Sequence, residues 1–272
     1  MGLPVGLLAG HGRQNDRGEK MARNDEHNLP AGQHGSAARL DKILASQGLA
    51  TRREAHRLIR AGRVTVEGAV CRDPAGKVPP GVAVTLDGRL LAIKPHLYIM
   101  MNKPAGILCV SRDPHALTVT GLLPPELRRR GLFPAGRLDK DTVGLVLITD
   151  DGDYAHRLLS PRAGVAKQYR AILDGPVGQE LVDSFAAGTS LEDGTPCLPA
   201  KCRILQEGPR PLVEVVITEG KYHQIKRMFA SHGRKVLWLA RLSIGGLALD
   251  PALEEGACRE LTEAEKAAVF AG

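Results

Sequence analysis

Apolar positions recur with two different spacings along the chain and predict two kinds of element. Within residues 40–44 and again within 55–59 they recur at helical spacing, so each segment predicts the buried face of a short helix. Apolar and polar residues then alternate over 64–66 and 82–86, and each of these segments ends at an Xaa-Gly pair typical of a tight turn. We therefore expect a small domain of two helices and short strands over residues 38–94.

From residue 97 onward, strand-like and helical segments follow one another to the C-terminus. This order favours an α+β domain over residues 97–272, with a mixed, mostly antiparallel sheet. Residues 102–106 are expected to form a turn, and Thr262 with Glu265 predicts a capped final helix. The predicted strands are 98–101, 143–148, 167–173 and 212–218, and the other predicted helices are 151–159 and 223–231.

The second helix of the N-terminal domain carries its own boundary signals and a basic face. Thr51 and Glu54 form a capping box, and Gly62 is a typical helix stop. Arginines spaced at i, i+4 and i+7 share the face opposite the apolar stripe. An ordinary solvated helix would show the same face, but clustered cations are also what an RNA backbone requires. The candidate RNA-binding residues of this helix are Arg52, Arg53, Arg57 and Arg60.

The positive charge of the chain is concentrated in this small domain. The whole chain has a formal net charge of +7 and a pI near 9.3, which favours a polyanionic partner without identifying it. Residues 39–72 hold eight Lys and Arg against three Asp and Glu, whereas residues 1–37 hold four of each. Residues 1–37 are also rich in Gly, Asn, Gln and His and lack periodicity, so we expect a disordered N-terminal tail.

Cysteine spacing and hydropathy narrow the class of protein further. The five cysteines are scattered and none forms a C-x-x-C pair. No His or further Cys completes a zinc set near Cys197 and Cys202. We therefore expect a reduced, cytoplasmic protein without a structural metal. No apolar run approaches the length needed to cross a membrane.

The strongest candidate for chemistry is a carboxylate within residues 136–145, Gly-Arg-Leu-Asp-Lys-Asp-Thr-Val-Gly-Leu. Asp139 lies between a bend and an apolar strand, where a rigidly held carboxylate can face a cleft. A turn aspartate paired with Arg137 is the structural alternative. The same letters Arg-Leu-Asp-Lys occur at 39–42, but there they open a helix. Asp41 is therefore expected to stabilise the helix dipole and to have no catalytic role.

Three motifs in order make the chain resemble a known family. They are residues 136–145, the pair Lys167-x-Tyr169, and residues 219–228, Glu-Gly-Lys-Tyr-His-Gln-Ile-Lys-Arg-Met. Over residues 39–270 the chain resembles a pseudouridine synthase of the RsuA family. Its N-terminal domain resembles the alpha-L RNA-binding motif of a ribosomal small-subunit protein. The implied reaction, uridine to pseudouridine, adds no atoms and transfers no net electrons, so no cofactor or metal is expected.

The resemblance implies a role for one residue of each motif. Asp139 would be the essential carboxylate, acting on the sugar as a nucleophile or as a base. Tyr169 would stack on a uracil flipped out of the RNA and would help to move its carbon-5 proton; a plain strand aromatic is the alternative. Lys226 would lie beside Asp139 and keep it ionised, the alternative being a solvated lysine on an amphipathic helix.

The resemblance also extends the RNA-binding surface beyond the N-terminal domain. Arg137 would enter the RNA where the base has left or bind a phosphate, and a structural ion pair with Asp139 or Asp141 remains the alternative. The motif around Lys226 supplies further candidates, either as scaffolding or as phosphate contacts. These candidates are Lys221, His223 and Arg227.

The target implied by the resemblance is ribosomal RNA. A lysine at position 226 within Tyr-His-Gln-Ile-Lys-Arg-Met-Phe resembles the branch that acts on 16S RNA of the small subunit. Two alternatives stay open: a synthase acting on 23S RNA of the large subunit, and a non-catalytic ribosome-assembly factor that binds RNA. The expected partner is 16S RNA or a small-subunit assembly particle, and the expected oligomeric state is a monomer.

Overall fold

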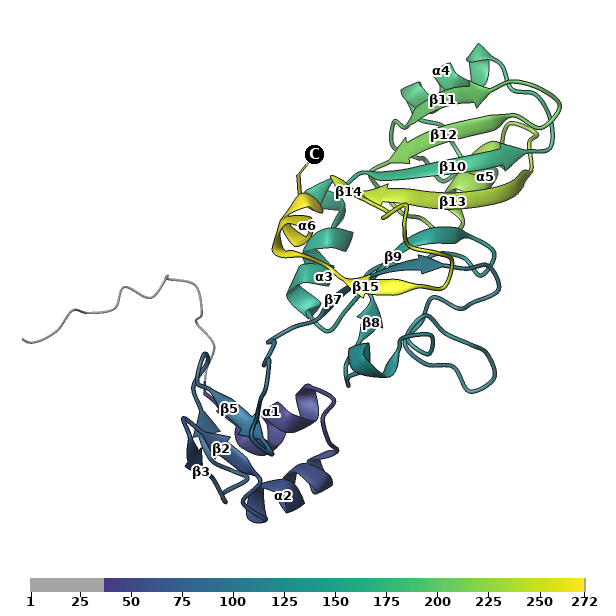
Figure 1. Ribbon diagram of the computed structural model, residues 1–272. Coiled ribbons are helices and arrows are strands. Elements are labelled where there is room, and N and C mark those ends of the chain that lie inside the picture. Colours follow the sequence, from purple (N-terminus) through teal and green to yellow (C-terminus); the bar gives the residue numbers. More distant parts are fainter. Residues whose placement is uncertain (1–36, 272) are drawn as a thin grey trace, which may run out of the picture. The chain divides into compact units, whose positions relative to one another are not determined.

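The computed structural model describes residues 37–271, which form a small N-terminal domain and a larger domain that follows it (Figure 1). The disorder expected for residues 1–37 falls almost wholly outside the described residues. Within the described part, no helix is long and apolar enough to cross a membrane.

The N-terminal domain packs two helices against short strands. Its core consists of apolar side chains from both helices and from the strands, including Leu40, Leu44, Ile59 and Val84, all fully buried. The strands form a four-stranded sheet in the order β3-β2-β5-β6 and a separate pair, β1 with β4. The elements are β1 (Ala38–Arg39), α1 (Leu40–Ser46), α2 (Arg52–Arg60), β2 (Val64–Val66), β3 (Ala69–Val70), β4 (Lys77–Val78), β5 (Val84–Leu86) and β6 (Arg89–Leu90).

Local sequence signals set the boundaries of these elements. The Thr51 side chain accepts the Glu54 amide while Glu54 accepts the Thr51 amide, so the predicted capping box of α2 is confirmed. Glu67 and Asp87 have positive φ, and each precedes a glycine that also has positive φ. Two successive residues with positive φ give the turn whose twist suits a hairpin, which explains why β2–β3 and β5–β6 turn tightly.

The larger domain is built on one nine-stranded sheet, in which seven strands follow the order β11-β12-β10-β13-β9-β7-β15. Within residues 37–271 the one parallel pair of strands joins β13 to β9, so the expected mixed, mostly antiparallel sheet is confirmed. Strands β14 and β8 pair with β13 and β9. The strands are β7 (Tyr98–Lys103), β8 (Phe133–Pro134), β9 (Val143–Thr149), β10 (Lys167–Leu173), β11 (Lys201–Gln206), β12 (Leu212–Ile217), β13 (Val236–Ile244), β14 (Leu247–Ala248) and β15 (Cys258–Glu260).

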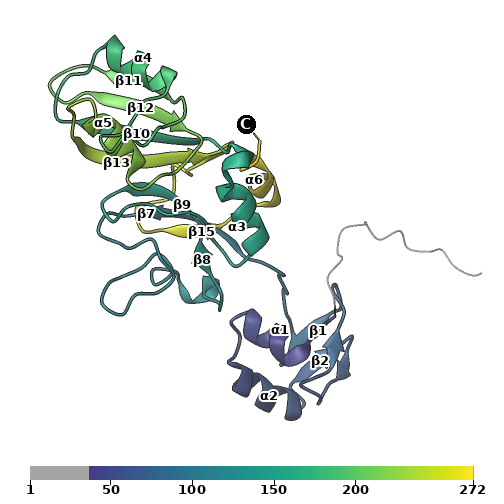
Figure 2. The ribbon, with the colours of Figure 1, turned by 180° about the vertical axis from the view of Figure 1, so that it is seen from behind.

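Helices cover this sheet in two groups (Figures 1 and 2). α4 and α5 pack on one face of β10, β12 and β13, whereas α3 packs against β7 and β9 together with Val269 and Phe270, which follow the final helix α6. Because β9 contributes to both cores, all seven of its residues are buried. The helices are α3 (Gly152–Leu159), α4 (Gln179–Ala187), α5 (Gln224–Ala230) and α6 (Glu263–Ala268), with 3₁₀ turns at Pro125–Leu127 and Pro161–Ala163.

Most predicted elements are present, and the differences fall at their ends. The predicted turn at 102–106 is wrong in its first half, because Asn102 and Lys103 continue β7 and pair with β9. Val82 and Ala83 lie outside β5, and Leu58 is only half-buried. Asp41 does occupy the first turn of α1, but it is also buried, accepting hydrogen bonds from Arg39 and contacting His56.

Candidate active site

Asp139 lies in the loop that links β8 to β9, at the start of a fully buried strand. The loop turns at Gly136, whose φ of +97° suits glycine, and closes where the Thr142 amide donates to the Asp139 carbonyl. The Asp139 side chain is about one-quarter exposed and lines a pocket. As expected, this carboxylate lies just before a strand and faces a pocket.

A buried lysine donates hydrogen bonds to the backbone of this loop. Lys103, at the end of β7, is fully buried, and its ammonium donates to the carbonyl oxygens of Pro104, Lys140 and Thr142 at 3.0, 3.1 and 2.8 Å. Three carbonyls satisfy the three donors of an ammonium, although burial still lowers the pKa of Lys103. The backbone on both sides of Asp141 is thereby tied to the sheet.

Helix α5 brings Lys226 to the same loop. Its ammonium lies 3.0 Å from Oδ2 of Asp139 and 2.5 Å from Oδ1 of Asp141. Ile225, Met228 and Phe229 face the core as predicted, which leaves Lys226 on the side of α5 that meets the loop. The sequence predicted the first of these ion pairs and missed the second.

Charge pairing shifts the protonation equilibria of this group. The hydrogen bond from Lys226 holds the pKa of Asp141 below its ordinary value. Burial by itself would lower the pKa of Lys226, but the carboxylates of Asp141 and Asp139 outweigh burial and hold that pKa above its ordinary value. Lys226 is therefore a cation at neutral pH, placed between two carboxylates.

Tyr169 completes one wall of the pocket. It lies on β10, paired with Val215 of β12 and Arg241 of β13, and only 7% of its surface is exposed. The residues lining the pocket come from the Asp139 loop, from β10, β12 and β13, and from α5 with the segment leading into it. They are Arg137, Leu138, Asp139, Thr142, Tyr169, Ile217, Gly220, Lys221, His223, Gln224, Ile225, Lys226 and Leu239. The structure thus brings together Asp139, Tyr169 and Lys226, which the sequence places far apart.

The segment before α5 is ordered by its own polar network. Gln224 is buried; its amide nitrogen donates to Glu219, and its amide oxygen accepts from the Lys221 backbone. Glu219 also forms an ion pair with Lys221 and accepts the Leu198 amide. These contacts join Glu219, Lys221 and Gln224 into one network and give Lys221 a structural partner.

The predicted RNA-binding residues fall into two sets. His223 and Arg137 line the pocket; the His223 Nε2 lies 3.4 Å from Oδ1 of Asp139. Among residues 37–271 no ion pair joins Arg137 to Asp139 or Asp141, so the structural alternative for Arg137 is not what is observed. Arg227 instead pairs with Asp193.

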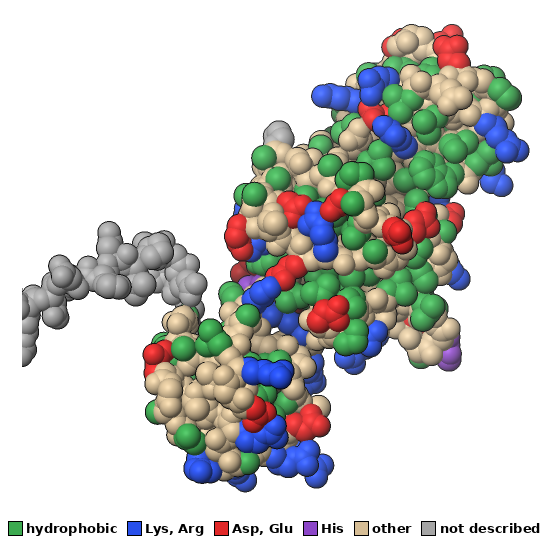
Figure 3. Space-filling view, viewed as in Figure 1, with side chains coloured by type: hydrophobic (Ala, Val, Ile, Leu, Met, Phe, Trp, Pro, Cys, Tyr) green, Lys and Arg blue, Asp and Glu red, His purple; other side chains and the backbone are tan. Residues whose placement is uncertain are grey.

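The second set lies on α2 in the N-terminal domain. Arg52, Arg53, Arg57 and Arg60 are all exposed, and Arg52 approaches buried Asp41 at 3.9 Å. Figure 3 shows Lys and Arg side chains gathered over the lower edge of this domain, where Figure 1 labels α2. These cations do not belong to the pocket around Asp139.

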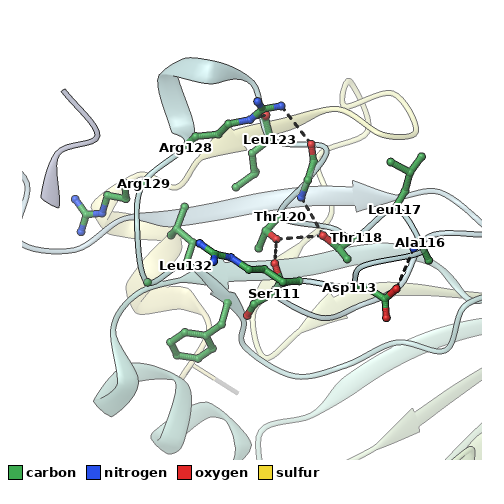
Figure 4. Close-up of a pocket in the computed structure, with 14 residues that line it drawn as sticks. Ser111, Asp113, Ala116, Leu117, Thr118, Thr120, Leu123, Arg128, Arg129 and Leu132 are labelled. Atoms are coloured by element: carbon green, nitrogen blue, oxygen red, sulfur yellow. Dashed lines mark hydrogen bonds between the residues drawn. The ribbon is translucent and has the colours of Figure 1, made fainter. Parts of the chain in front are cut away.

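A larger hollow of about 800 Å³ lies between residues 111 and 133 (Figure 4). Three of its polar side chains have partners within the protein: Arg128 donates to backbone carbonyls, Arg129 pairs with Asp150, and the Thr120 hydroxyl donates to the Ser111 carbonyl. Asp113 accepts two backbone amides. The ion pair of Arg129 with Asp150 is largely buried, and Asp150 does not line the hollow, whereas Asp139 lines its own pocket.

Sequence reasoning missed several residues at the site. The sequence predicts a turn at Lys103, but the apolar run at 98–101 and Pro104 directly after Lys103 are also compatible with the end of a strand. The Thr142 hydroxyl is buried without a hydrogen-bond partner in the described part of the chain, and it lines the pocket. No group of three or more His, Cys, Asp or Glu side chains within residues 37–271 could hold a metal ion.

The chain is similar to known proteins over most of its length. Residues 97–231 match the RNA pseudouridylate synthase family, and residues 38–84 match the S4 domain. The chain is 43% identical over 229 residues to an uncharacterized RNA pseudouridine synthase of Bacillus subtilis, covering 84% of this chain and 96% of that protein. It is also 43% identical to ribosomal small subunit pseudouridine synthase A of Escherichia coli K12, over 85% of this chain and 99% of the other.

A solved structure supports the same assignment. A crystal structure of a pseudouridylate synthase aligns with a TM-score of 0.60 and 37% identity, covering 85% of this chain and 99% of that one. The two matched regions follow one another as the sequence predicted, an RNA-binding domain first and the enzyme domain second. The chain therefore belongs to the pseudouridine synthase family, in its RsuA branch with an N-terminal S4 domain.

Proposed function

We propose that this protein converts a specific uridine of 16S ribosomal RNA to pseudouridine. The observation that carries the proposal is the Asp139 carboxylate, 3.0 Å from the Lys226 ammonium in a pocket walled by Tyr169. The similarity to relatives named ribosomal small subunit pseudouridine synthase A supports the choice of RNA. Lys226 also lies in the motif, residues 222–229, that resembles the small-subunit branch of the family.

The residue types in the pocket suit this isomerisation. The bond between ribose and ring nitrogen-1 breaks, the uracil turns, and a bond forms from the ribose to carbon-5. The carbon-5 proton then leaves and nitrogen-1 gains a proton, so atoms and charge balance within the substrate and the protein. A single carboxylate that acts on the sugar, either as a nucleophile or as a base, is sufficient for this sequence of steps.

The target base must leave the RNA stack before it can reach Asp139. Extrusion costs a few kcal/mol and requires a pocket that receives the flipped base. In the proposal, Tyr169 stacks on the uracil and assists the loss of the carbon-5 proton, and Arg137 enters the RNA or binds a phosphate. Lys226 pairs with Asp139 at 3.0 Å and compensates its negative charge.

The N-terminal domain supplies RNA affinity in this proposal. The exposed arginines of α2 contact phosphates, and such contacts position an RNA without reading its bases. We assign residues 38–94 to this role and residues 97–272 to the chemistry. The protein would act in the cytoplasm as a monomer, on 16S RNA or on a small-subunit assembly particle.

The test compares Asp139→Asn with the native protein and with Asp141→Asn. Conversion is read from carbodiimide adducts and primer-extension stops on both ribosomal RNAs of a deletion strain complemented with each gene. We expect one stop in 16S RNA to disappear on deletion, to return with the native protein and with Asp141→Asn, and to stay absent with Asp139→Asn. Turnover by Asp139→Asn would refute the role of that carboxylate. A stop lost from 23S RNA would assign a large-subunit target, and RNA binding without any lost stop would indicate an assembly factor.

A further inference from the structure

Tyr222 is an unusually exposed aromatic residue at the edge of the pocket. It exposes 75% of its surface, more than any other large apolar residue among those described. Two of the other tyrosines donate their hydroxyl groups to protein partners, Tyr98 to Asp151 and Tyr154 to the Lys266 carbonyl. Among the described residues, the Tyr222 hydroxyl has no such partner, so hydrogen bonding within the protein does not account for this side chain.

The ring of Tyr222 is nevertheless held in place. It stacks on the ring of His223 with centroids 3.8 Å apart and an interplanar angle of 20°. Its backbone carbonyl accepts a hydrogen bond from Arg227 of α5. With one face of the ring on His223 and three-quarters of the residue exposed, the opposite face is open to a ligand.

His223 connects this stack to the reacting group. Its Nε2 lies 3.4 Å from Oδ1 of Asp139, and it lines the pocket. It also has a φ of +49°, a left-handed conformation that is uncommon for a residue with a side chain. Such backbone strain persists only where the surrounding structure maintains it, and here it sets the direction of both rings at the start of α5. The Tyr222–His223 stack is therefore joined to Asp139 through the Nε2 of His223.

We propose that Tyr222, supported by His223, is a stacking platform for the nucleotide next to the target uridine. The inference rests on the proposed function. When a uridine leaves the stack, its neighbour loses one stacked face, and an aromatic ring at the rim can replace it. Bases stack on exposed aromatic side chains in single-stranded RNA recognition, largely without regard to base identity. Tyr222 would thus hold the RNA in the opened state while adding no contact to the reacting atoms.

Binding and turnover should respond differently to this platform. Tyr222→Ala should raise KM and Kd for an RNA fragment centred on the mapped uridine by about tenfold or more, the usual effect of losing one base–aromatic stack. The kcat at saturating RNA should change by less than about threefold. Tyr222→Phe, which keeps the ring, should bind as the native protein does. The dependence of affinity on salt should be unchanged, because no phosphate contact is lost.

A matched change in the RNA separates stacking from a general loss of affinity. Fragments carrying an abasic nucleotide at each position beside the target uridine are bound to Tyr222 and to Tyr222→Ala proteins, both in the Asp139→Asn background so that no turnover occurs. At one position the abasic RNA should bind both proteins equally. If the Ala variant is weaker by the same factor on every fragment, or if Phe and Ala behave alike, the platform does not exist.

A simpler probe keeps this inference distinct from the proposed function. Octauridylate binding, measured by fluorescence anisotropy, requires no knowledge of the target and no conversion. If no pseudouridine is ever formed but Tyr222→Ala still weakens octauridylate binding about tenfold, the proposed function fails and the platform stands. If Tyr222→Ala binds octauridylate with native affinity, the platform is disproved even in an active enzyme.

Discussion

Lys226 lies between two carboxylates, and the charge balance of the pocket depends on it. In Lys226→Met, Asp139 and Asp141 lose the cation that they share, and Asp141 loses the hydrogen bond that holds its pKa below its ordinary value. We expect kcat/KM at pH 7 to fall by about a hundredfold or more, because no positive charge then compensates the two neighbouring carboxylates. Lys226→Arg should keep most of the activity, because it keeps the charge.

Asp141→Asn is the matched control for that change, since it leaves the contact between Asp139 and Lys226 in place. It should cost less than about tenfold in kcat/KM, a loss of roughly 1.4 kcal/mol in transition-state stabilisation. If Asp141→Asn were as damaging as Lys226→Met, the ion pair with Asp139 would not be the contact that matters.

Buried Asp41 makes stability depend on pH. The Arg39 guanidinium, with His56 and a backbone amide, holds the pKa of Asp41 far below its ordinary value despite burial. A carboxyl whose folded-state pKa is depressed stabilises the fold above its unfolded-state pKa of about 3.9, and this contribution is lost as pH falls toward the folded-state pKa. The free energy of unfolding should therefore decline below about pH 4.

Asp41→Asn isolates this contribution. At pH 7 the variant should unfold with about 2 kcal/mol less free energy, because a charged hydrogen-bond acceptor has been removed from a buried site. The difference from the native protein should shrink as urea titrations are repeated at progressively lower pH below 4. A difference that stays constant across that range would contradict the assigned charge.

At the scale of elements, the pairing of β9 with β13 fixes where the Asp139 loop ends and β9 begins. Gly144 has a φ of +96°, and a Cβ there would lie 2.3 Å from the Arg241 carbonyl oxygen. Gly144 faces Arg241 across the only parallel pairing in the described sheet, and the Arg241 guanidinium donates to the Leu145 carbonyl. Gly144→Ala should therefore lower the free energy of unfolding by about 3 kcal/mol or more.

A control for Gly144→Ala exists in a second glycine with positive φ. Gly106 has a φ of +84°, but a Cβ there would meet nothing within 4 Å. Gly106→Ala should cost only the conformational strain, roughly 1 kcal/mol. Thermal unfolding of both variants measures the difference, and equal losses would show that the close approach at Gly144 has no effect.

The helices and strands that could be predicted are those whose sequence signals come from neighbouring residues. Capping boxes at Thr51 and Thr262, and the strand at 167–173, depend on neighbours in the sequence, and all are present. Lys103 was not predictable as a strand residue, because a lysine becomes buried only when distant carbonyls can satisfy it, and two of its three acceptors lie 37 and 39 residues away. Sequence order likewise could not show that Asp141 shares Lys226.

The two copies of Arg-Leu-Asp-Lys also show what local sequence signals can and cannot predict about the site. Helical periodicity after Asp41 and an apolar strand after Asp139 correctly separated a structural aspartate from one that faces a pocket. The exposed ring of Tyr222 gave no such signal, because an aromatic residue inside a motif predicts burial as readily as exposure. Its role depends on the left-handed backbone at His223, which no pattern in the sequence indicates.

For the whole molecule, the arginines of α2 should govern how affinity for RNA depends on salt. Each phosphate neutralised by a cation contributes about 0.7 to 0.9 to the slope of log K against log salt concentration. Replacing Arg53, Arg57 and Arg60 together by Gln should therefore reduce that slope by about 2 and weaken binding at low salt. All three side chains are exposed, and none forms an ion pair among the described residues.

The control is a second triple variant, in which Arg130, Arg162 and Arg210 are replaced by Gln. These arginines are equally exposed but lie outside residues 38–94, so the net charge falls by the same amount. If general attraction between a basic protein and a polyanion governed binding, both variants would lose the same slope. If α2 contacts the phosphates directly, only the first variant loses it, and its kcat at saturating RNA stays close to native because Asp139, Tyr169 and Lys226 are unchanged. If the two variants had equal slopes of log K against log salt concentration, α2 would not be part of the RNA interface. The assignment of the pocket would not be affected.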